Sequence, residues 1–67
     1  MCLSTVYTLG MGGSLQKIGE YVTTLNVVGD TITFAELMGA ETSIKGTFQS
    51  VDLIKNKIVI EEQRQSN

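Results

Sequence analysis

Residues 21–36, YVTTLNVVGDTITFAE, carry the pattern that decides the fold. In the second half of this stretch, Ile32 and Phe34 alternate with other residues, a period of two that sends both side chains to one face of a strand. The pair Gly29-Asp30 interrupts the stretch with residue types that readily adopt the backbone conformations of a tight turn. The stretch therefore predicts a β-hairpin with its turn at the centre.

The same kind of pattern continues on both sides of this hairpin. Runs rich in β-branched and aromatic residues are separated by glycines, and no proline interrupts the pairing of strands. The one rival is a short helical turn near residues 36–40, which is too short to be stable by itself. The predicted strands are residues 2–9, 15–18, 21–28, 31–36, 41–45, 47–53 and 57–61.

Short strands with one apolar face each cannot bury that face in a small flat sheet, whereas a barrel closes the core and removes exposed edges. We therefore predict an all-β, single-domain small β-barrel of six to seven short antiparallel strands over residues 1–62. Residues 63–67 form a flexible polar C-terminal tail in this interpretation. The sharp bends of the barrel are expected at Gly19, Gly29, Gly39 and Gly46.

The charge and composition exclude several classes of function. The net charge is −2 and the basic residues are scattered, so the sequence disfavours nucleic acid as a partner. No apolar run approaches the length of a membrane span, and the single cysteine cannot form an internal disulfide. We expect a cytoplasmic protein without membrane contact. There is no histidine and no convincing catalytic constellation, so we expect a protein that is not an enzyme.

The position of that single cysteine suggests a metal site. The Cys2 sulfur and its own backbone nitrogen can close a five-membered chelate ring on a metal ion, and the free amine of Met1, if retained, can add a second ring. One chain supplies too few strong donors, whereas a homodimer supplies two sulfurs and two nitrogens. Such a tetragonal set suits Ni(II), or equally Cu(II). We therefore predict a metal site made of Cys2 and Met1 from two chains.

The order of these features resembles the CooT family of small nickel-binding proteins. The resemblance rests on Met1-Cys2 followed by a strand, a glycine-containing hairpin, a central hairpin, and the closing stretch KGTFQSVDLIKNKIVIEE, residues 45–62. It implies a homodimeric β-barrel of the SH3 or Sm type. It also implies a nickel metallochaperone, an accessory protein for maturation of carbon monoxide dehydrogenase, with Cys2 in the metal site. The loop GMGGS, residues 10–14, is longer and richer in methionine than the charged turn expected for the family.

Two alternatives remain open at the level of sequence. The first is a small RNA-binding β-barrel, a label that members of the family have also carried, with bases stacked on Tyr7, Tyr21, Phe34 or Phe48. The second is a purely structural dimer that binds no metal. The choice between nickel and copper, the client enzyme and the processing of Met1 also remain open. The thioether of Met38 is expected to fill a loop or the core and not to bind metal.

Overall fold

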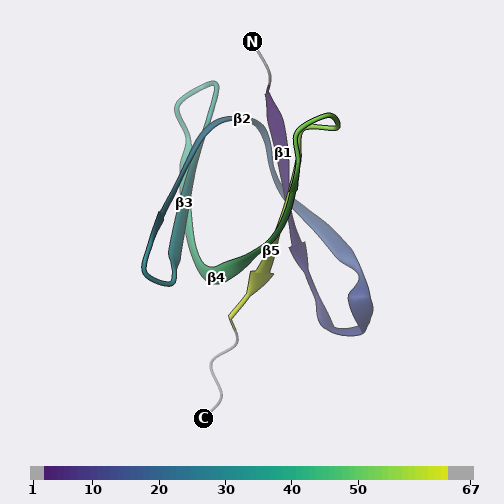
Figure 1. Ribbon diagram of the computed structural model, residues 1–67. Coiled ribbons are helices and arrows are strands. Elements are labelled where there is room, and N and C mark those ends of the chain that lie inside the picture. The colour runs from purple at the N-terminus through teal and green to yellow at the C-terminus, as the bar shows by residue number, and fades with distance from the viewer. Residues whose placement is uncertain (1–2, 64–67) are drawn as a thin grey trace.

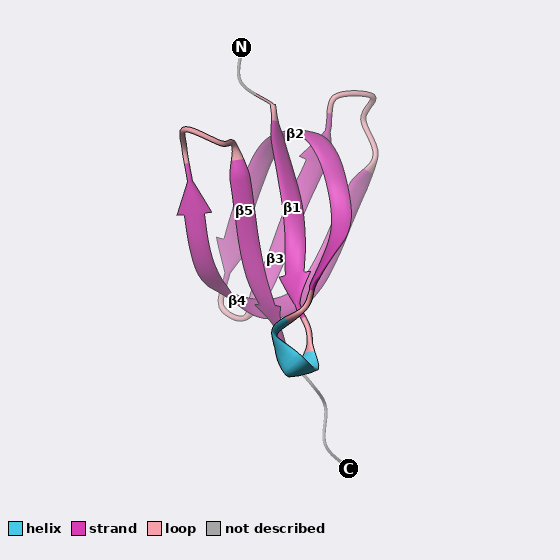
Figure 2. Ribbon diagram, turned by 90° about the vertical axis from the view of Figure 1, so that its right-hand side faces the viewer, coloured by secondary structure: helices cyan, strands magenta, loops and turns pink. Residues whose placement is uncertain are grey.

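A computed structural model describes residues 3–63 of the chain as a closed five-stranded barrel (Figures 1 and 2). Each strand pairs with the next one, and the last pairs with the first. The small β-barrel predicted from the sequence is thereby confirmed. Within residues 3–63, no helix is long and apolar enough to cross a membrane. The elements are β1 (Ser4–Leu9), the 3-10 turn η1 (Met11–Gly13), β2 (Leu15–Val28), β3 (Thr31–Glu36), β4 (Glu41–Asp52) and β5 (Lys57–Glu62).

The strands are fewer and longer than the six to seven that the sequence suggested. Both β2 and β4 run through the glycines that separate predicted strands and at which the barrel is expected to bend, Gly19 and Gly46. The first half of β2 pairs with β1 and its second half with β3, while β4 is shared in the same way between β3 and β5. β2 and β4 are therefore curved strands that each pair with two neighbouring strands. Gly19 and Gly46 lie at bends inside these strands.

The remaining predicted corners lie in turns. Gly29 (φ 60°) and Gly39 (φ 96°) both adopt left-handed backbone conformations, in the β2–β3 and β3–β4 connections respectively. An L side chain at such a φ is strained, so glycine is the favoured residue at both turns.

The barrel is closed by a parallel pair, whereas the four other pairings are antiparallel. β1 and β5 align from Thr5 opposite Lys57 to Leu9 opposite Glu61. In a ring of consecutive strands that alternate in direction, an odd number of strands leaves the first and last pointing the same way. The all-antiparallel arrangement expected for six strands is therefore impossible for five.

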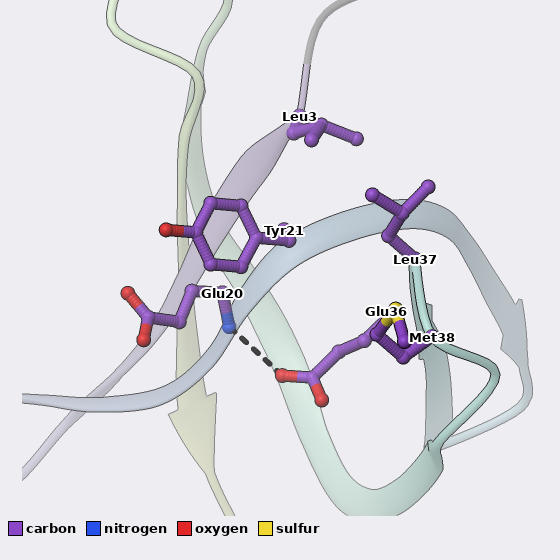
Figure 3. Close-up of a pocket in the computed structure, with 6 residues that line it drawn as sticks. All are labelled: Leu3, Glu20, Tyr21, Glu36, Leu37 and Met38. Atoms are coloured by element: carbon purple, nitrogen blue, oxygen red, sulfur yellow. Dashed lines mark hydrogen bonds between the residues drawn. The ribbon is translucent and has the colours of Figure 1, made fainter.

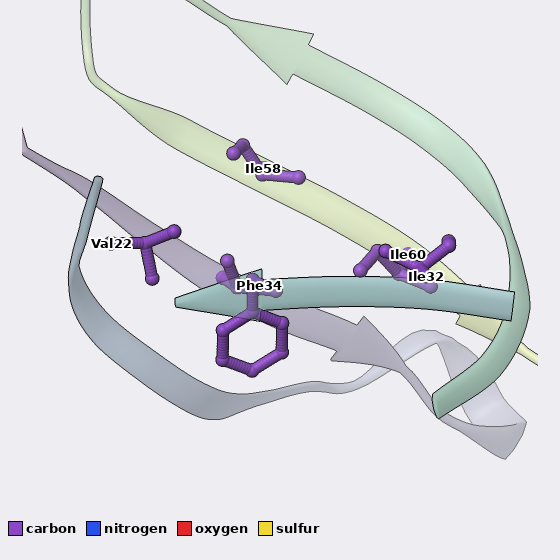
Figure 4. Close-up of a cluster of buried hydrophobic side chains, with 6 residues drawn as sticks. Val22, Ile32, Phe34, Ile58 and Ile60 are labelled. Carbon is purple, nitrogen blue, oxygen red and sulfur yellow. The ribbon is translucent and has the colours of Figure 1, made fainter. Parts of the chain in front are cut away.

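The core consists of inward-facing side chains from four of the strands (Figure 4). Ile32 and Phe34 are buried, as their alternation predicted. Gly19 of β2 lies against the ring of Phe34, and a Cβ atom at this position would overlap that ring. The absence of a side chain at residue 19 therefore lets the largest core residue fill the barrel. The buried cluster is Val6, Val22, Ile32, Phe34, Ile58 and Ile60.

This contact predicts that Gly19→Ala destabilises the barrel by about 1–3 kcal/mol, because overpacking forces side chains or backbone to shift. In a Phe34→Leu background the smaller side chain relieves the overlap, so the same substitution should cost less. Urea unfolding of the four proteins in this double-mutant cycle measures the coupling. Strictly additive changes in the free energy of unfolding would contradict the proposed contact.

Candidate functional site

The described part of the chain begins at Leu3, directly after the two residues predicted to bind metal. Met1 and Cys2 lie outside the described residues, so their role stays a prediction. Leu3 precedes β1 at the end of the barrel that also carries the β3–β4 and β4–β5 turns (Figures 1 and 2). The surroundings of Leu3 are therefore the nearest described environment of the predicted metal ligands.

Leu3 lines a pocket of about 460 Å³, which we call the N-terminal pocket (Figure 3). It lies between the start of β1, the bend of β2, the end of β3 and the turn that follows β3. Its surface is mostly apolar, with two carboxylates in the wall, a composition typical of sites that receive a ligand or a partner's side chain. The lining residues are Leu3, Glu20, Tyr21, Glu36, Leu37 and Met38.

Tyr21 forms one wall of the pocket from an unusual backbone conformation. Its φ is 56°, in the left-handed region that costs an aromatic L-residue about 1–2 kcal/mol. The pairing register with β1 shifts around it, since Val22 pairs with Ser4 whereas Gly19 pairs with Val6. β2 is therefore irregular at its bend, and the side chain of Tyr21 is left 60% exposed.

Two hydrogen bonds hold this bend against the end of β3. The backbone N–H of Glu20 donates to Oε2 of Glu36 at 2.9 Å (Figure 3). The backbone N–H of Leu37 donates to the carbonyl oxygen of Tyr21 at 2.8 Å. Because the bonds flank residue 21 on both sides, they fix the conformation that would otherwise be unfavourable, and with it the shape of the pocket.

The β3–β4 turn carries two apolar side chains outward. The turn is closed by hydrogen bonds from Glu36 N–H to Ala40 O and from Gly39 N–H to Glu36 O, both 2.8 Å. Leu37 is 53% exposed and Met38 is 93% exposed. Of the two places expected for Met38, a loop or the core, the structure gives the loop, because strand residues already fill the interior.

The carboxylate of Glu20 is engaged by a neighbouring lysine. Nζ of Lys17 donates to Oε2 of Glu20 at 3.0 Å, and the two groups are about half exposed. The hydrogen bond and the charge of Glu20 raise the pKa of Lys17. Glu36 has no such ion pair within residues 3–63. The pocket therefore presents a carboxylate, that of Glu36, which is not neutralised by a lysine or arginine of the described chain.

Comparison with known protein families identifies the family of this chain. A family model described as CO dehydrogenase accessory protein CooT matches residues 1–61, nearly the whole chain. The chain belongs to the CooT family. The resemblance inferred from Met1-Cys2 and the closing stretch is confirmed, and the match includes both residues predicted to bind metal.

The fold agrees with that of a solved CooT-family structure. A protein from Carboxydothermus hydrogenoformans, assigned to CooT, superposes with a TM-score of 0.84 over 94% of this chain and 100% of the other. The two sequences are 17% identical, so this likeness supports the shared fold alone. None of the curated proteins matches the chain.

The described residues supply no complete metal site within one chain. Among residues 3–63, no three side chains of the His, Cys, Asp and Glu types come together as a possible ligand set. Residues 3–63 therefore form the barrel and the N-terminal pocket, and the predicted metal donors precede them in the sequence.

The aromatic residues considered for base stacking have different environments. Phe34 is 1% exposed in the core, so it is unavailable to a nucleic acid base. Tyr7 is half-buried with Nζ of Lys57 lying 5.4 Å from its ring centroid, a cation–π contact. Tyr21 and Phe48 remain exposed. Two of the four predicted stacking residues are thus occupied by contacts within the barrel.

The strained backbone predicts an unusual order of stabilities at residue 21. Tyr21→Gly should be more stable than Tyr21→Ala by about 1 kcal/mol, because only glycine adopts positive φ without penalty. At Thr24, an exposed residue of the same strand without positive φ, alanine should instead be the more stable substitution. Urea unfolding measures both pairs. The same order at the two positions would contradict the left-handed conformation of residue 21.

Proposed function

We propose that this CooT-family protein is a nickel metallochaperone that binds one Ni(II) ion between the Cys2 residues of two chains. The metal is cargo for a client nickel enzyme such as carbon monoxide dehydrogenase, and the chain itself catalyses no reaction. The observation that carries the proposal is the family match over residues 1–61, which assigns an accessory role and includes Cys2. In this proposal the homodimer acts in the cytoplasm.

The chemistry of the available donors supports this cargo. The sequence contains one cysteine and no histidine, so Cys2 is its only thiolate and the usual nitrogen ligand is missing. Backbone nitrogen and thiolate donors from two chains form a tetragonal set, which suits Ni(II) or Cu(II) better than Zn(II) or Mg(II). Met1 contributes its amine if it remains the first residue. Cu(II) is therefore the competing ion in every binding test.

The pocket beside Leu3 supports a site shared between chains. Leu3, which directly follows Cys2 in the sequence, lines an apolar surface. Such a surface excludes water when a partner covers it, and a lower dielectric strengthens the bond between a nearby cation and a thiolate. The RNA-binding alternative has less support, because Phe34 is buried and the net charge is −2. We therefore retain RNA binding as an outcome to be tested.

Removal of the thiolate should abolish specific nickel binding. We expect isothermal titration to give one Ni(II) per two wild-type chains, with a thiolate-to-metal charge-transfer band in the ultraviolet. Cys2→Ser should lose the band and weaken binding by at least about a hundredfold, because a soft thiolate is replaced by a hydroxyl. Met38→Leu, which removes an exposed thioether near the pocket, is the matched control and should bind as the wild type does.

Two results would contradict the proposal. One is wild-type nickel affinity in Cys2→Ser. The other is tight, strongly salt-dependent RNA binding in a filter assay together with indifference to Ni(II), Cu(II), Zn(II) and Co(II). Light scattering of the metal-free protein should give about twice the chain mass.

Acid should weaken nickel binding while the barrel stays folded. A thiol has an ordinary pKa of about 8.5, and binding requires its thiolate, so protons compete with the metal as the pH falls. We expect the apparent affinity to drop by about tenfold or more for each pH unit from about pH 8 to about pH 6. Titrations at a series of pH values, with circular dichroism as the control for folding, measure this slope. An affinity independent of pH would exclude a thiolate ligand.

A further inference from the structure

The bends that close the barrel leave part of each bent strand with a single neighbour. The second half of β4 pairs with β5, and no other strand of residues 3–63 pairs with its opposite side. Figure 2 shows this half of β4 as the outermost strand, with β5 on one side only. We call residues 47–52 the β4 edge. The backbone N–H and C=O groups along such an edge can pair with another extended chain.

The β4 edge carries two apolar side chains on the face that lines the core. Phe48 pairs with Ile60, Val51 pairs with Ile58, and directly opposed side chains share a face. Residues 48 and 51 lie on the same face although they are three positions apart, because the register shifts between Phe48 and Ser50. The two isoleucines are buried, whereas Phe48 is 44% exposed and Val51 is 49% exposed. The core is therefore incompletely covered along the β4 edge.

The β4 edge has few of the features that normally prevent an edge from pairing. Natural edges are often protected by proline or by inward-pointing charges. Residues 47–52 contain no proline, and their one charged residue is Asp52 at the end of the strand. Oδ1 of Asp52 accepts hydrogen bonds from the backbone N–H groups of Ile54 and Lys55, each 3.0 Å long. Apart from the bulge after Phe48, the edge is therefore suited to an added strand.

An acidic cavity adjoins the start of the β4 edge. It has a volume of about 540 Å³ and is lined by Asp30, Thr47, Glu61, Glu62 and Gln63. None of its three carboxylates forms an ion pair within residues 3–63. Lys45 borders a smaller adjoining cavity with two of the same carboxylates, so negative charge remains in excess. The β4 edge therefore combines apolar contacts along its length with negative charge at its start, which favours a partner that is apolar and basic.

We infer that the β4 edge receives an extended segment of another protein, which adds to the sheet as an antiparallel strand. Antiparallel pairing is slightly more stable per residue than parallel pairing. In this direction the C-terminal end of the segment lies beside Thr47, so its basic residues belong at that end. Its apolar side chains, at alternate positions, lie beside Phe48 and Val51 and continue the core.

This inference goes beyond the proposed function, because the contact uses neither the metal nor its ligands. A metallochaperone must recognise its client, and the β4 edge supplies a surface for that recognition. The recognition is of a peptide segment with a stated chemistry: alternating apolar residues followed by lysine or arginine.

Peptides of defined pattern test the pairing. The probe is a synthetic peptide in which valine alternates with threonine, with a pair of lysines at its C-terminal end and both termini blocked. We expect isothermal titration to give one peptide per chain, and hydrogen exchange at the backbone amides of residues 47–52 to slow in the complex. Moving the lysines to the N-terminal end should weaken binding by at least about tenfold, because the charges then lie away from the acidic cavity.

A second set of probes tests the backbone pairing itself. Successive N–H groups of a strand point to opposite sides, so N-methylation of one alternating set of peptide amides should weaken binding by at least about tenfold. N-methylation of the other set should leave the affinity within about twofold of that of the unmodified probe.

Variants of the chain locate the contact. Val51→Lys places a charge on the inward face of the β4 edge and should weaken binding of the probe by at least about tenfold. Val27→Lys is the matched control and should bind the probe as the wild type does. Val27 is 46% exposed, lies opposite the buried Ile32, and belongs to the half of β2 that pairs only with β3. Circular dichroism verifies that both variants are folded.

A charge exchange tests the basic end of the segment. Glu61→Lys should weaken binding of the lysine-ended probe and strengthen binding of a probe that ends in a pair of glutamates. An unchanged preference for the lysine-ended probe would contradict a contact with the acidic cavity.

Three further results would overturn the inference. The first is equal binding of the probe and both N-methylated forms. The second is loss of binding in Val27→Lys but not in Val51→Lys. The third is a fall to half the particle mass of the metal-free protein in light scattering on Val51→Lys substitution, which would assign the β4 edge to a second copy of the chain.

The two proposals fail independently. If Cys2→Ser binds nickel as the wild type does while the probe pairs with the β4 edge, the metallochaperone fails and the docking surface stands. If nickel binds through Cys2 but the probe does not bind, the docking surface is wrong and the metallochaperone stands.

Discussion

The structure depends on closure of the sheet between β1 and β5. A chain of this length buries only about 60% of the surface that its unfolded form exposes, so it cannot leave two strand edges and one apolar face open. Five strands close the ring because β2 and β4 bend and pair with two neighbours each. Gly19 allows one of these bends to pack against Phe34, and at Gly46 a Cβ atom would overlap the backbone of β5. The fold thus depends on two positions without a side chain as much as on the buried ones.

Much of the fold was predictable, because the alternation of apolar and polar residues is typical of a half-buried strand. Ile32 and Phe34 were assigned to the interior from their spacing, and the structure buries both. The number of strands was not predictable from the same pattern, because glycine within a β-rich run is compatible with either the end of a strand or a bend inside it. Only the neighbour across the barrel, Phe34 in the case of Gly19, distinguishes the two.

The candidate site was predictable only in part. Cys2 could be singled out from the sequence, because the metal-binding chemistry of a thiolate depends on the residue type and can be inferred without knowing the fold. The pocket beside Leu3 depends on the left-handed Tyr21, and an aromatic residue gives no sequence signal for that conformation. Leu53 was assigned to the end of a strand, but Asp52 redirects the chain by accepting two backbone N–H groups and turns the next residues outward. An Asp followed by two apolar residues and Lys-Asn was the available signal for an exposed tip.

The parallel pairing of β1 and β5 separates the two ends of the chain. Because both strands run in the same direction, the chain enters the barrel at one end and leaves β5 at the other (Figure 1). Met1 and Cys2, to which we assign binding of the cargo, directly precede the entry end in the sequence. Purification tags, fluorophores or surface anchors attached after β5 therefore leave the entry end free, whereas any extension placed before Met1 converts its amine into an amide and removes one proposed ligand.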